Sequence, residues 1–403
     1  MKLPLAHLLP LVTRKDPDDT FAFPGTSVSW ASGRLDVFIN DFGLLYHKYH
    51  ANPDAGWNKD FETMDFPLLD MNTHPTAISW AENRLDIFAA SQGGLFHKFW
   101  DGSQWNPEKG AEELASEMYG TFAVTSWAEG RFDIIGLDHD GGYSHKYWDG
   151  TAWKPDGLAA ESLGTDGFDG QFFASYPTAV SWGENRLDIF GILSNATLLH
   201  KYWDGNAWQP SATGWESWGD DFFDQPVATS WGENRLDVWA VREDGQLAHR
   251  YWTGSTLSDI ETLGGSFHNT PTITHWGANR IDIFGITTGG SVVYKYWDGY
   301  QWNPSDNSKP WSAHGSGVVA GPSSVAWSAN NINTFALDSN GTLKWQFWEG
   351  SQWLPKPDGF YDLGTLPAPD SSMIHLRAMK KSKPNKAPNN AFVVQDLERG
   401  LDL

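Results

Sequence analysis

A polar triplet and an aromatic corner supply the side chains of this chain that could hold a ligand. In one copy the triplet is Glu184, Asn185 and Arg186, and the corner is Trp203 and Asp204. An aromatic face can cover the apolar C–H patch of a pyranose, while carboxylate, amide and guanidinium groups exchange hydrogen bonds with its hydroxyls. These residue types therefore favour a sugar as the ligand of a small concave site.

The same set recurs at four other places in the chain, with a few replacements. The equivalent residues are Glu82, Asn83, Arg84, Trp100 and Asp101; Glu129, Arg131, Trp148 and Asp149; Glu233, Asn234, Arg235 and Trp252; and Asn279, Arg280, Trp297 and Asp298. Gly130, Thr253 and Ala278 stand where the complete set has Asn, Asp and Glu. We predict that these residues form repeated carbohydrate-binding sites of comparable composition.

A longer repeat carries these residues. Its clearest copy is SWGENRLDIFGILSNATLLHKYWDGNAWQP, which covers residues 181–210. The leading tryptophans of the seven copies are Trp30, Trp80, Trp127, Trp182, Trp231, Trp276 and Trp327, which lie 50, 47, 55, 49, 45 and 51 residues apart. Self-similarity at such a nearly fixed period is the signature of a repeat architecture.

Each repeat contains four short stretches with the alternation of a β-strand. In the clearest copy they are residues 177–182, 186–192 and 198–203 and a fourth stretch that begins near Trp208, with Gly and Asn in the turns between them. Four-stranded antiparallel units with a period of about 40–50 residues form the blades of a propeller. The sequence therefore predicts an all-β, seven-bladed β-propeller built from seven four-stranded repeats.

The order of the strands predicts which turns meet. In a meander of four strands, the first and third turns lie at the same end of the sheet. We therefore expect the triplet at 184–186 near the corner formed by Trp203 and Asp204, either in its own blade or in a neighbouring blade.

The repeats also set the domain boundaries. We expect an N-terminal segment over residues 1–25, one propeller domain over 26–365, and a C-terminal tail over 366–403 that could be a degenerate half-repeat or a closure strand. The third repeat carries an insertion at 165–175, which we expect to form a long loop at the junction with the fourth repeat.

The first and last repeats depart from the pattern. The first has Ser32 in place of Glu and His50 in place of Trp, and the last has Ala329 in place of Glu and Asn331 in place of Arg. Terminal repeats are often atypical. We expect the sites of these two repeats to be weak or empty, which leaves about four or five functional sites among the seven repeats.

Packing and internal hydrogen bonding are competing roles for the repeated residues. We favour packing between blades for the SW tryptophans, and weigh packing and ligand contact equally for the YWDG tryptophans. The LD aspartates are expected to accept buried hydrogen bonds; they are Asp86, Asp133, Asp188, Asp237 and Asp282. The HKYW histidines recur once per repeat, which favours structural hydrogen bonds over a shared metal site; they are His97, His145, His200 and His249.

The overall composition bounds the partners and the compartment. The chain has 403 residues, a formal net charge of −22, no cysteine and 24 tryptophans. The negative charge argues against nucleic acid or an anionic membrane as the main partner, and without cysteine there are no disulfides or thiolate metal sites. No stretch is long enough to span a membrane, and no clear signal peptide is found, so the cytoplasm and secretion both stay open. We expect no cofactor.

The motif SWGENRLD, followed by LxHKYWDGxxW and WExxG, resembles the repeat of the PLL-like lectins, the fucose-binding propellers of the Photorhabdus type. The resemblance covers roughly residues 26–364. It implies a seven-bladed β-propeller without catalytic activity, which binds fucose and O-methylated sugars in shallow sites repeated around the ring. Homo-oligomer formation stays open.

Two other functions are alternatives to a lectin. A protein-interaction propeller would present varied loops on one face, whereas the turns of repeats 2 to 6 are nearly the same here. A glycan-processing enzyme would need one pair of carboxylates beside a single bond, whereas the carboxylates here are spread over the repeats and no G-x-S-x-G, HExxH or phosphate-loop motif occurs. The sequence therefore favours a multivalent, non-enzymatic, carbohydrate-binding protein.

Overall fold

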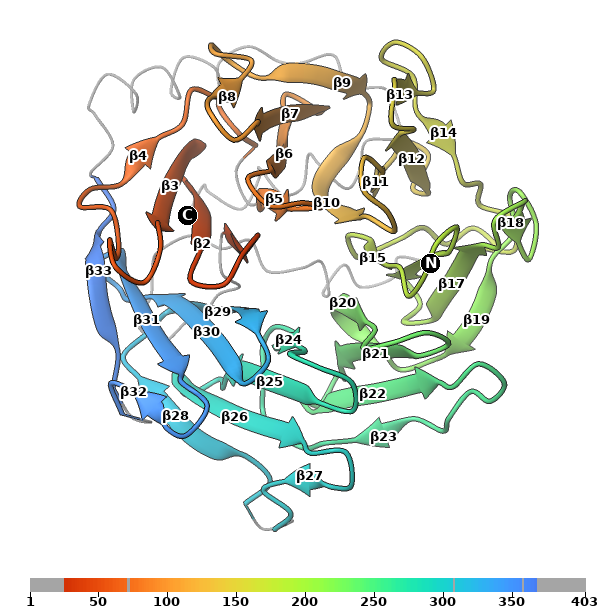
Figure 1. Ribbon diagram of the computed structural model, residues 1–403. Helices are drawn as coiled ribbons and strands as arrows, with labels where there is room; N and C mark the ends of the chain where they lie inside the picture. The colour runs from red at the N-terminus through yellow and green to blue at the C-terminus, as the bar shows by residue number, and fades with distance from the viewer. Residues whose placement is uncertain (1–24, 71–72, 307–308, 357–358, 368–403) are drawn as a thin grey trace, which may run out of the picture.

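Seven antiparallel sheets form a closed ring (Figure 1). The computed structural model describes residues 25–70, 73–306, 309–356 and 359–367, and every helix or strand assigned in these ranges is a β-strand. The predicted all-β, seven-bladed propeller is therefore confirmed. Residues 1–24 of the expected N-terminal segment lie outside the described residues. Residues 368–403 of the expected C-terminal tail also lie outside them. Within the described ranges, no helix has the length and apolarity needed to cross a membrane.

The first three blades follow one another in chain order. Blade 1 contains β1 (Gly25–Val28), β2 (Leu35–Asp41), β3 (Leu44–His50) and β4 (Glu62–Thr63). Blade 2 contains β5 (Thr76–Ile78), β6 (Leu85–Ser91), β7 (Gly94–Trp100), β8 (Trp105–Asn106) and β9 (Glu112–Ser116). Blade 3 contains β10 (Tyr119–Thr125), β11 (Phe132–Leu137), β12 (Tyr143–Trp148), β13 (Trp153–Lys154) and β14 (Glu161–Ser162).

The other four blades continue the same order. Blade 4 contains β15 (Thr178–Val180), β16 (Leu187–Ile192), β17 (Leu198–Trp203), β18 (Trp208–Gln209) and β19 (Glu216–Gly219). Blade 5 contains β20 (Phe223–Thr229), β21 (Leu236–Val241), β22 (Leu247–Trp252) and β23 (Glu261–Thr262). Blade 6 contains β24 (Thr272–Thr274), β25 (Ile281–Ile286), β26 (Ser291–Trp297), β27 (Trp302–Asn303) and β28 (Ser312–Ser316). Blade 7 contains β29 (Ala320–Ser328), β30 (Asn331–Leu337), β31 (Thr342–Trp348), β32 (Trp353–Leu354) and β33 (Tyr361–Thr365).

Each blade is a four-stranded meander whose outer strand is divided into two pieces in most blades. In blade 4, β18 and β19 both pair with β17. Trp203 of β17 lies opposite Trp208 of β18, and His200 lies opposite Glu216 of β19. The two pieces of the outer strand therefore place Trp208 and Glu216 beside the third strand.

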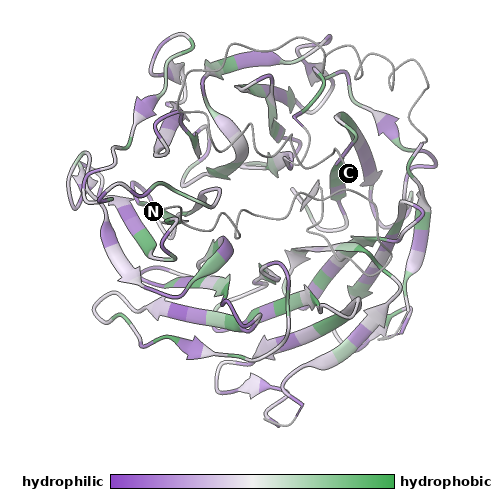
Figure 2. Ribbon diagram, turned by 180° about the vertical axis from the view of Figure 1, so that it is seen from behind, coloured by the Kyte–Doolittle hydropathy of each residue, from purple (hydrophilic) through white to green (hydrophobic). Residues whose placement is uncertain are grey.

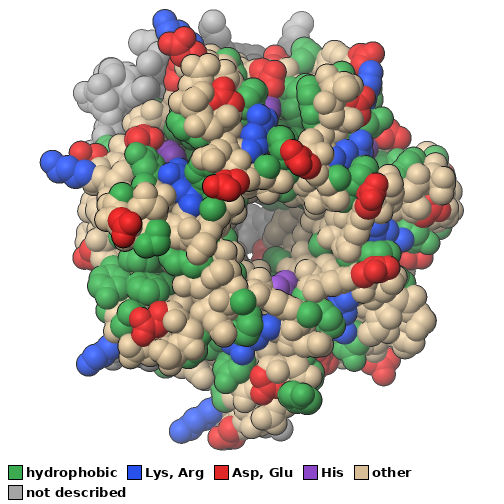
Figure 3. All heavy atoms as spheres, viewed as in Figure 1, with side chains coloured by type: hydrophobic (Ala, Val, Ile, Leu, Met, Phe, Trp, Pro, Cys, Tyr) green, Lys and Arg blue, Asp and Glu red, His purple; other side chains and the backbone are tan. Residues whose placement is uncertain are grey.

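The hydrophobic core lies between the blades. All six residues of β16 are buried, because each face of this strand packs on a neighbouring sheet. Between blades 4 and 5, Phe190 of β16 packs with Leu236 and Val238 of β21. An equivalent cluster joins β2 of blade 1 to β30 of blade 7 and closes the ring. The apolar stretches follow the strands (Figure 2), and a space-filling view shows an opening at the centre of the ring (Figure 3).

The insertion at 165–175 forms the predicted loop at the junction of blades 3 and 4. Phe168 and Phe173 are buried there, and the ring of Phe173 stacks on that of Tyr143 at 3.8 Å between ring centres. Trp215 packs against the same cluster from blade 4. The loop therefore contributes apolar core to this junction.

A buried lysine of the third strand holds the loop between the two halves of the outer strand. Lys201 Nζ donates to the carbonyl oxygens of Ser211 and Gly214 at 2.7 and 2.8 Å. A buried ammonium group requires such acceptors. The equivalent lysines, Lys48, Lys98, Lys146 and Lys295, also donate to carbonyls of this loop. This contact fixes the start of β19 and so the position of Glu216.

Candidate functional site

The first and third turns of each blade pack against each other, as predicted. Gly205 of the third turn has φ 95°, and a Cβ atom there would lie 3.3 Å from the Cβ of Asn185 in the first turn. Gly102, Gly254 and Gly299 lie in the same way against the asparagines of their own blades. The polar triplet and the glycine after the aromatic corner are therefore neighbours within one blade.

Backbone conformation explains the asparagine of the triplet. Asn185 has φ 59°, in the left-handed region that Gly and Asn adopt most readily. Gly130 has φ 70° at the same position of blade 3, so the repeat alternates between the two residue types that suit this turn. Glu184 and Asn185 are both exposed at the tip of the turn.

The aspartate of the aromatic corner closes its own turn. Asp204 Oδ1 accepts hydrogen bonds from the backbone N–H groups of Asn206 and Ala207 at 2.9 Å each, and Oδ2 accepts one from Gln209 at 2.8 Å. Asp101, Asp149 and Asp298 accept the equivalent backbone bonds. Both oxygens of Asp204 are therefore engaged within the turn.

The arginine of the triplet binds the LD aspartate. Arg186 donates from Nε to Asp188 Oδ2 at 2.7 Å and from Nη2 to Asp188 Oδ1 at 2.5 Å. Its Cζ lies 3.9 Å from the ring centre of Tyr202, and this stacking orients the guanidinium plane. A guanidinium has five N–H groups, so the bidentate pair leaves three for other acceptors. The buried hydrogen bonds predicted for the LD aspartates are confirmed.

The HKYW histidine connects this aspartate to a glutamate of the outer strand. His200 Nε2 lies 2.9 Å from Asp188 Oδ1, and Nδ1 lies 2.7 Å from Glu216 Oε1. Since both nitrogens face carboxylate oxygens, both must carry a proton in order to donate. Burial lowers the pKa of His200, but the hydrogen bonds to Asp188 and Glu216 outweigh burial and raise this pKa above 6.5. The structural role predicted for these histidines is confirmed.

Glu216 forms the exposed end of this line of hydrogen bonds. Its side chain is 45% exposed, whereas that of Asp188 is 0% exposed. Glu216 Oε1 accepts bonds from His200 and from Trp218 Nε1, the latter at 3.3 Å. The hydrogen bond with His200 lowers the pKa of Glu216 below 4.5. Glu216 is therefore a carboxylate at neutral pH, and its Oε2 is open to a ligand.

We call the four side chains a relay, and blades 1 to 5 contain it. The relays are Arg34–Asp36–His47–Glu62, Arg84–Asp86–His97–Glu112, Arg131–Asp133–His145–Glu161, Arg186–Asp188–His200–Glu216 and Arg235–Asp237–His249–Glu261. In blade 6, Tyr294 and Ser312 take the places of His and Glu. In blade 7 the relay positions hold Asn331, Asn333, Trp345 and Tyr361. Among the described residues, only the first five blades end the relay in a carboxylate.

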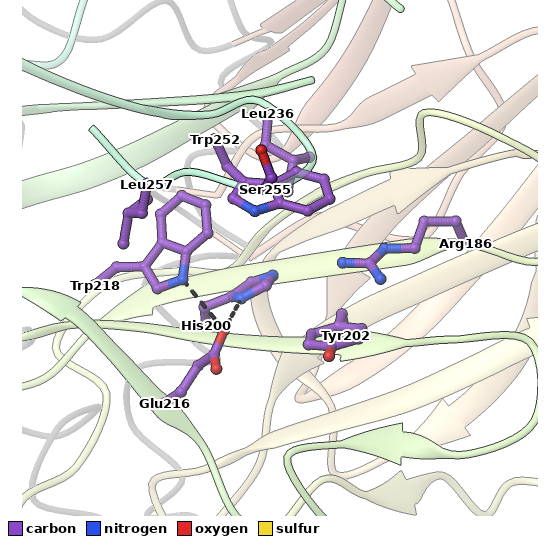
Figure 4. Close-up of a pocket in the computed structure, with 9 residues that line it drawn as sticks. All are labelled: Arg186, His200, Tyr202, Glu216, Trp218, Leu236, Trp252, Ser255 and Leu257. Atoms are coloured by element: carbon purple, nitrogen blue, oxygen red, sulfur yellow. Dashed lines mark hydrogen bonds and ion pairs between the residues drawn. The ribbon is translucent and has the colours of Figure 1, made fainter. Parts of the chain in front are cut away.

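The relay of blade 4 faces a pocket of about 280 Å³ at the junction with blade 5 (Figure 4). The lining residues from blade 4 are Arg186, His200, Tyr202, Glu216 and Trp218, and those from blade 5 are Leu236, Trp252, Ser255 and Leu257. Trp252 is the YWDG tryptophan of blade 5, and its ring centre lies 6.0 Å from Arg186 Cζ. The arginine therefore meets the aromatic corner of the neighbouring blade, one of the two arrangements that the sequence left open.

The other YWDG tryptophans lie at equivalent junctions. Trp100, Trp148, Trp203 and Trp297 each pack, half-buried, against the apolar cluster shared with the preceding blade. Five of the SW tryptophans also pack in clusters between blades, as predicted: Trp80, Trp182, Trp231, Trp276 and Trp327. Each relay of blades 1 to 5 is therefore followed by a tryptophan from the next blade.

The predicted site residues divide into two groups. The arginines and the YWDG tryptophans reach the junctions, whereas the triplet glutamates, Glu82, Glu129, Glu184 and Glu233, are exposed at turn tips. The relay glutamates were not predicted from the sequence, and neither was Tyr202, whose ring stacks on the guanidinium of Arg186. The missed glutamates follow the relay histidines by 15, 15, 16, 16 and 12 residues, so a variable loop obscures their recurrence.

Comparison with known protein families identifies one repeat in the chain. A family described as "Repeat of unknown function (DUF346)" matches residues 236–273. No curated protein matches the chain.

Two solved structures of lectins also match the chain. The chain is similar to the BP39L lectin from Burkholderia pseudomallei, with 15% identity and a TM-score of 0.67 over 86% of this chain and 100% of that one. It also matches the Aleuria aurantia lectin, solved with alpha-methyl-L-fucoside, with 15% identity and a TM-score of 0.49 over 71% of this chain and 95% of that one. At such identity, the likeness to the BP39L lectin extends to the fold alone.

Proposed function

We propose that this protein is a lectin whose sites lie at the junctions between blades, and that it binds fucosylated or O-methylated glycans. The observation that carries the proposal is the meeting of Arg186, Glu216 and Trp252 in one pocket. They provide a donor, an acceptor and an aromatic face, which together suit a sugar. The resemblance of the repeat to fucose-binding propellers supplies the sugar class.

The relay prepares the polar side of the site. One sugar hydroxyl accepts a hydrogen bond from the free Nη1 of Arg186, and a neighbouring hydroxyl donates to the free Oε2 of Glu216. Hydrogen bonds to charged groups contribute about 1.5–3 kcal/mol each. Because Asp188 and His200 hold both groups in place, little ordering is needed on binding. The configuration of the two hydroxyls therefore decides which sugar binds.

The apolar side of the site comes from the next blade. The C–H face of the sugar packs on the ring of Trp252, while Tyr202 supports the guanidinium from below. A site shared by two blades changes the expectation for the first repeat. Blade 1 has a complete relay, and its aromatic partner is Trp100 of blade 2. The substitution at His50 instead affects the junction of blades 7 and 1.

We therefore propose five sites, one for each complete relay. A shallow sugar site has weak intrinsic affinity, with a dissociation constant of about 1 μM to 1 mM. On a glycan-coated surface several sites of one rigid ring engage together, and avidity rises by about 10²–10⁴ without a new type of contact. Multivalency is thus part of the proposal.

The proposal is for binding without catalysis. A glycosidase uses two carboxyl groups on either side of the scissile bond. In the pocket of blade 4, Asp188 is buried and holds Arg186 and His200, which leaves Glu216 as the accessible carboxylate. One accessible carboxylate in this pocket fits a binding site.

The test combines a glycan array with surface plasmon resonance on dense and sparse fucosylated surfaces. Changing Trp100, Trp148, Trp203, Trp252 and Trp297 together to alanine should abolish binding to the dense surface, while circular dichroism shows that the ring still folds. The control variant changes the turn glutamates, Glu82, Glu129, Glu184 and Glu233, to glutamine, and it should bind like the parent. If the tryptophan variant folds and binds as tightly as the parent, the junctions are not the sites.

A further inference from the structure

The junction of blades 4 and 5 differs from the other four relay junctions in the position of its second tryptophan. In the other four relay junctions, a second indole from the following blade packs on the first, with ring centres 5.3–5.7 Å apart. These second tryptophans are Trp105, Trp153, Trp208 and Trp302. In blade 5 the equivalent position, opposite Trp252, is Leu257. Here the indole of Trp218, from blade 4, lines the same pocket as Trp252.

This exchange opens the junction. Trp218 stands over the relay, with its ring centre 4.7 Å from those of Phe190 and His200. Leu257 is smaller than an indole, so space remains beside Trp252. The pocket of about 280 Å³ occupies this space, and Arg186 and Trp218 approach it from opposite sides in Figure 4.

The lining of the added space has a definite chemistry. Leu236, Leu257 and Trp218 form an apolar wall, and Ser255 brings one hydroxyl to the exposed edge. An acetamido group matches this wall, because its methyl carbon packs on apolar side chains while its carbonyl oxygen accepts a hydrogen bond from a hydroxyl. At the other four relay junctions an indole takes the place of Leu257 beside the YWDG tryptophan.

Resting on the proposed lectin function, we propose that the junction of blades 4 and 5 is a distinct site that also accepts a sugar carrying an acetamido group. The other four relay junctions accept the unsubstituted ring and exclude the acetamido form. The ring thus binds the unsubstituted sugar at all five relay junctions and its acetamido derivative only at the junction of blades 4 and 5.

The experiment compares two probes that differ only in this substituent. They are the methyl glycoside of L-fucose and the methyl glycoside of N-acetyl-L-fucosamine, each titrated into the full chain by calorimetry. We expect the acetamido sugar to bind at one site per chain. Leu257→Trp should close the pocket and weaken that binding at least about tenfold, which corresponds to ~1.4 kcal/mol.

Two further variants sharpen the test. Leu158→Trp makes the same change at a side chain 45% exposed on blade 3 and should leave the acetamido sugar bound as in the parent. Trp208→Leu removes the second indole from the junction of blades 3 and 4. The acetamido sugar should then bind at this junction as well.

The outcomes separate this inference from the proposed function. If the fucoside binds but the acetamido sugar binds nowhere, or binds with the same stoichiometry as the fucoside, the selective pocket is refuted and the lectin proposal stands. If Leu257→Trp leaves acetamido binding unchanged, the pocket is also refuted. If neither probe binds and no glycan on an array is recognised, the lectin function itself fails, and this inference fails with it.

Discussion

Blades 4 and 7 share one strand order, but the relay positions hold ionisable side chains in blade 4 and neutral side chains in blade 7. Blade 4 places Arg186, Asp188, His200 and Glu216 where blade 7 places Asn331, Asn333, Trp345 and Tyr361. In blade 7, Trp345 Nε1 donates to Asn333 Oδ1 at 3.0 Å, and Asn333 Nδ2 donates to Asn331 Oδ1 at 2.7 Å. The buried Asn333 is therefore hydrogen-bonded to neutral side chains on both sides.

A blade of this ring therefore folds without the charges. Burying ions costs several kcal/mol, and exchanging a buried ion network for well-packed neutral residues is often neutral or stabilising. The charged relays present a carboxylate that is 39–47% exposed, which blade 7 does not. We infer that the charges of blades 1 to 5 serve ligand binding, while the aromatic set of blade 7 packs the junction that closes the ring.

The largest expected effect comes from breaking one relay at its centre. Asp188→Ala leaves the positive charges of Arg186 and His200 buried without their partner, and should lower the free energy of unfolding by about 3–5 kcal/mol. The equivalent change in blade 7, Asn333→Ala, removes neutral hydrogen bonds only and should cost about 1–3 kcal/mol. Urea unfolding of both variants measures the difference. Equal losses would mean that charge does not distinguish the two blades.

A second experiment converts blade 4 to the pattern of blade 7. The variant combines Arg186→Asn, Asp188→Asn, His200→Trp and Glu216→Tyr. We expect the ring to fold with a free energy of unfolding within about 2 kcal/mol of the parent, since the neutral set replaces the whole relay. Calorimetric titration should show one ligand site fewer than the parent. An unchanged number of sites would show that the relay is not part of the site.

The sequence predicted the fold and part of the candidate site. The repeat period and strand alternation determine the propeller, because each unit must bury its apolar face against the next. The arginines and YWDG tryptophans were identified as site residues, but whether Arg186 meets Trp203 or Trp252 depends on how one sheet packs on another. Local patterns do not contain that information.

Other predicted site residues have a structural role that their residue types alone do not reveal. Asn185 and Asp204 suit a sugar by chemistry, yet the structure uses the first for a left-handed turn and the second for turn hydrogen bonds. Gly130, at the position of Asn185, was the signal in the sequence for the turn. Glu216 gave no such signal, because the loop before it varies in length between repeats.

A third prediction concerns pH, and it follows from the two ends of the relay. The raised pKa of His200 adds stability that is complete below pH 6.5 and is lost as pH rises through the folded-state value. The lowered pKa of Glu216 adds stability that is complete above pH 4.5 and is lost as pH falls through its folded-state value. The relay therefore contributes fully between pH 4.5 and 6.5.

Urea unfolding across this range checks the prediction. The parent, with five relays, should lose stability above pH 6.5, since all five histidines have raised pKa values. The variant with the blade 7 pattern in blade 4 keeps four relays and should lose correspondingly less. A parent whose stability rises steadily from pH 6.5 to pH 8 would contradict the doubly protonated imidazoles.

The smallest expected effects come from changing single tryptophans, one at a relay site and one in blade 7. Four additional contacts that together raise avidity by about 10²–10⁴ correspond to roughly 3–10-fold for each contact. Trp252→Ala removes one relay site and should weaken binding to a dense glycan surface by about that factor. Trp348→Ala makes the same change at the junction of blades 6 and 7, where Ser312 replaces the carboxylate, and should leave binding unchanged. Surface plasmon resonance on dense and sparse surfaces measures both variants, with urea unfolding as the check on folding. If Trp348→Ala weakens binding as much as Trp252→Ala, the aromatic corner defines a site without the relay carboxylate, and the junction of blades 6 and 7 must be added to the proposed five.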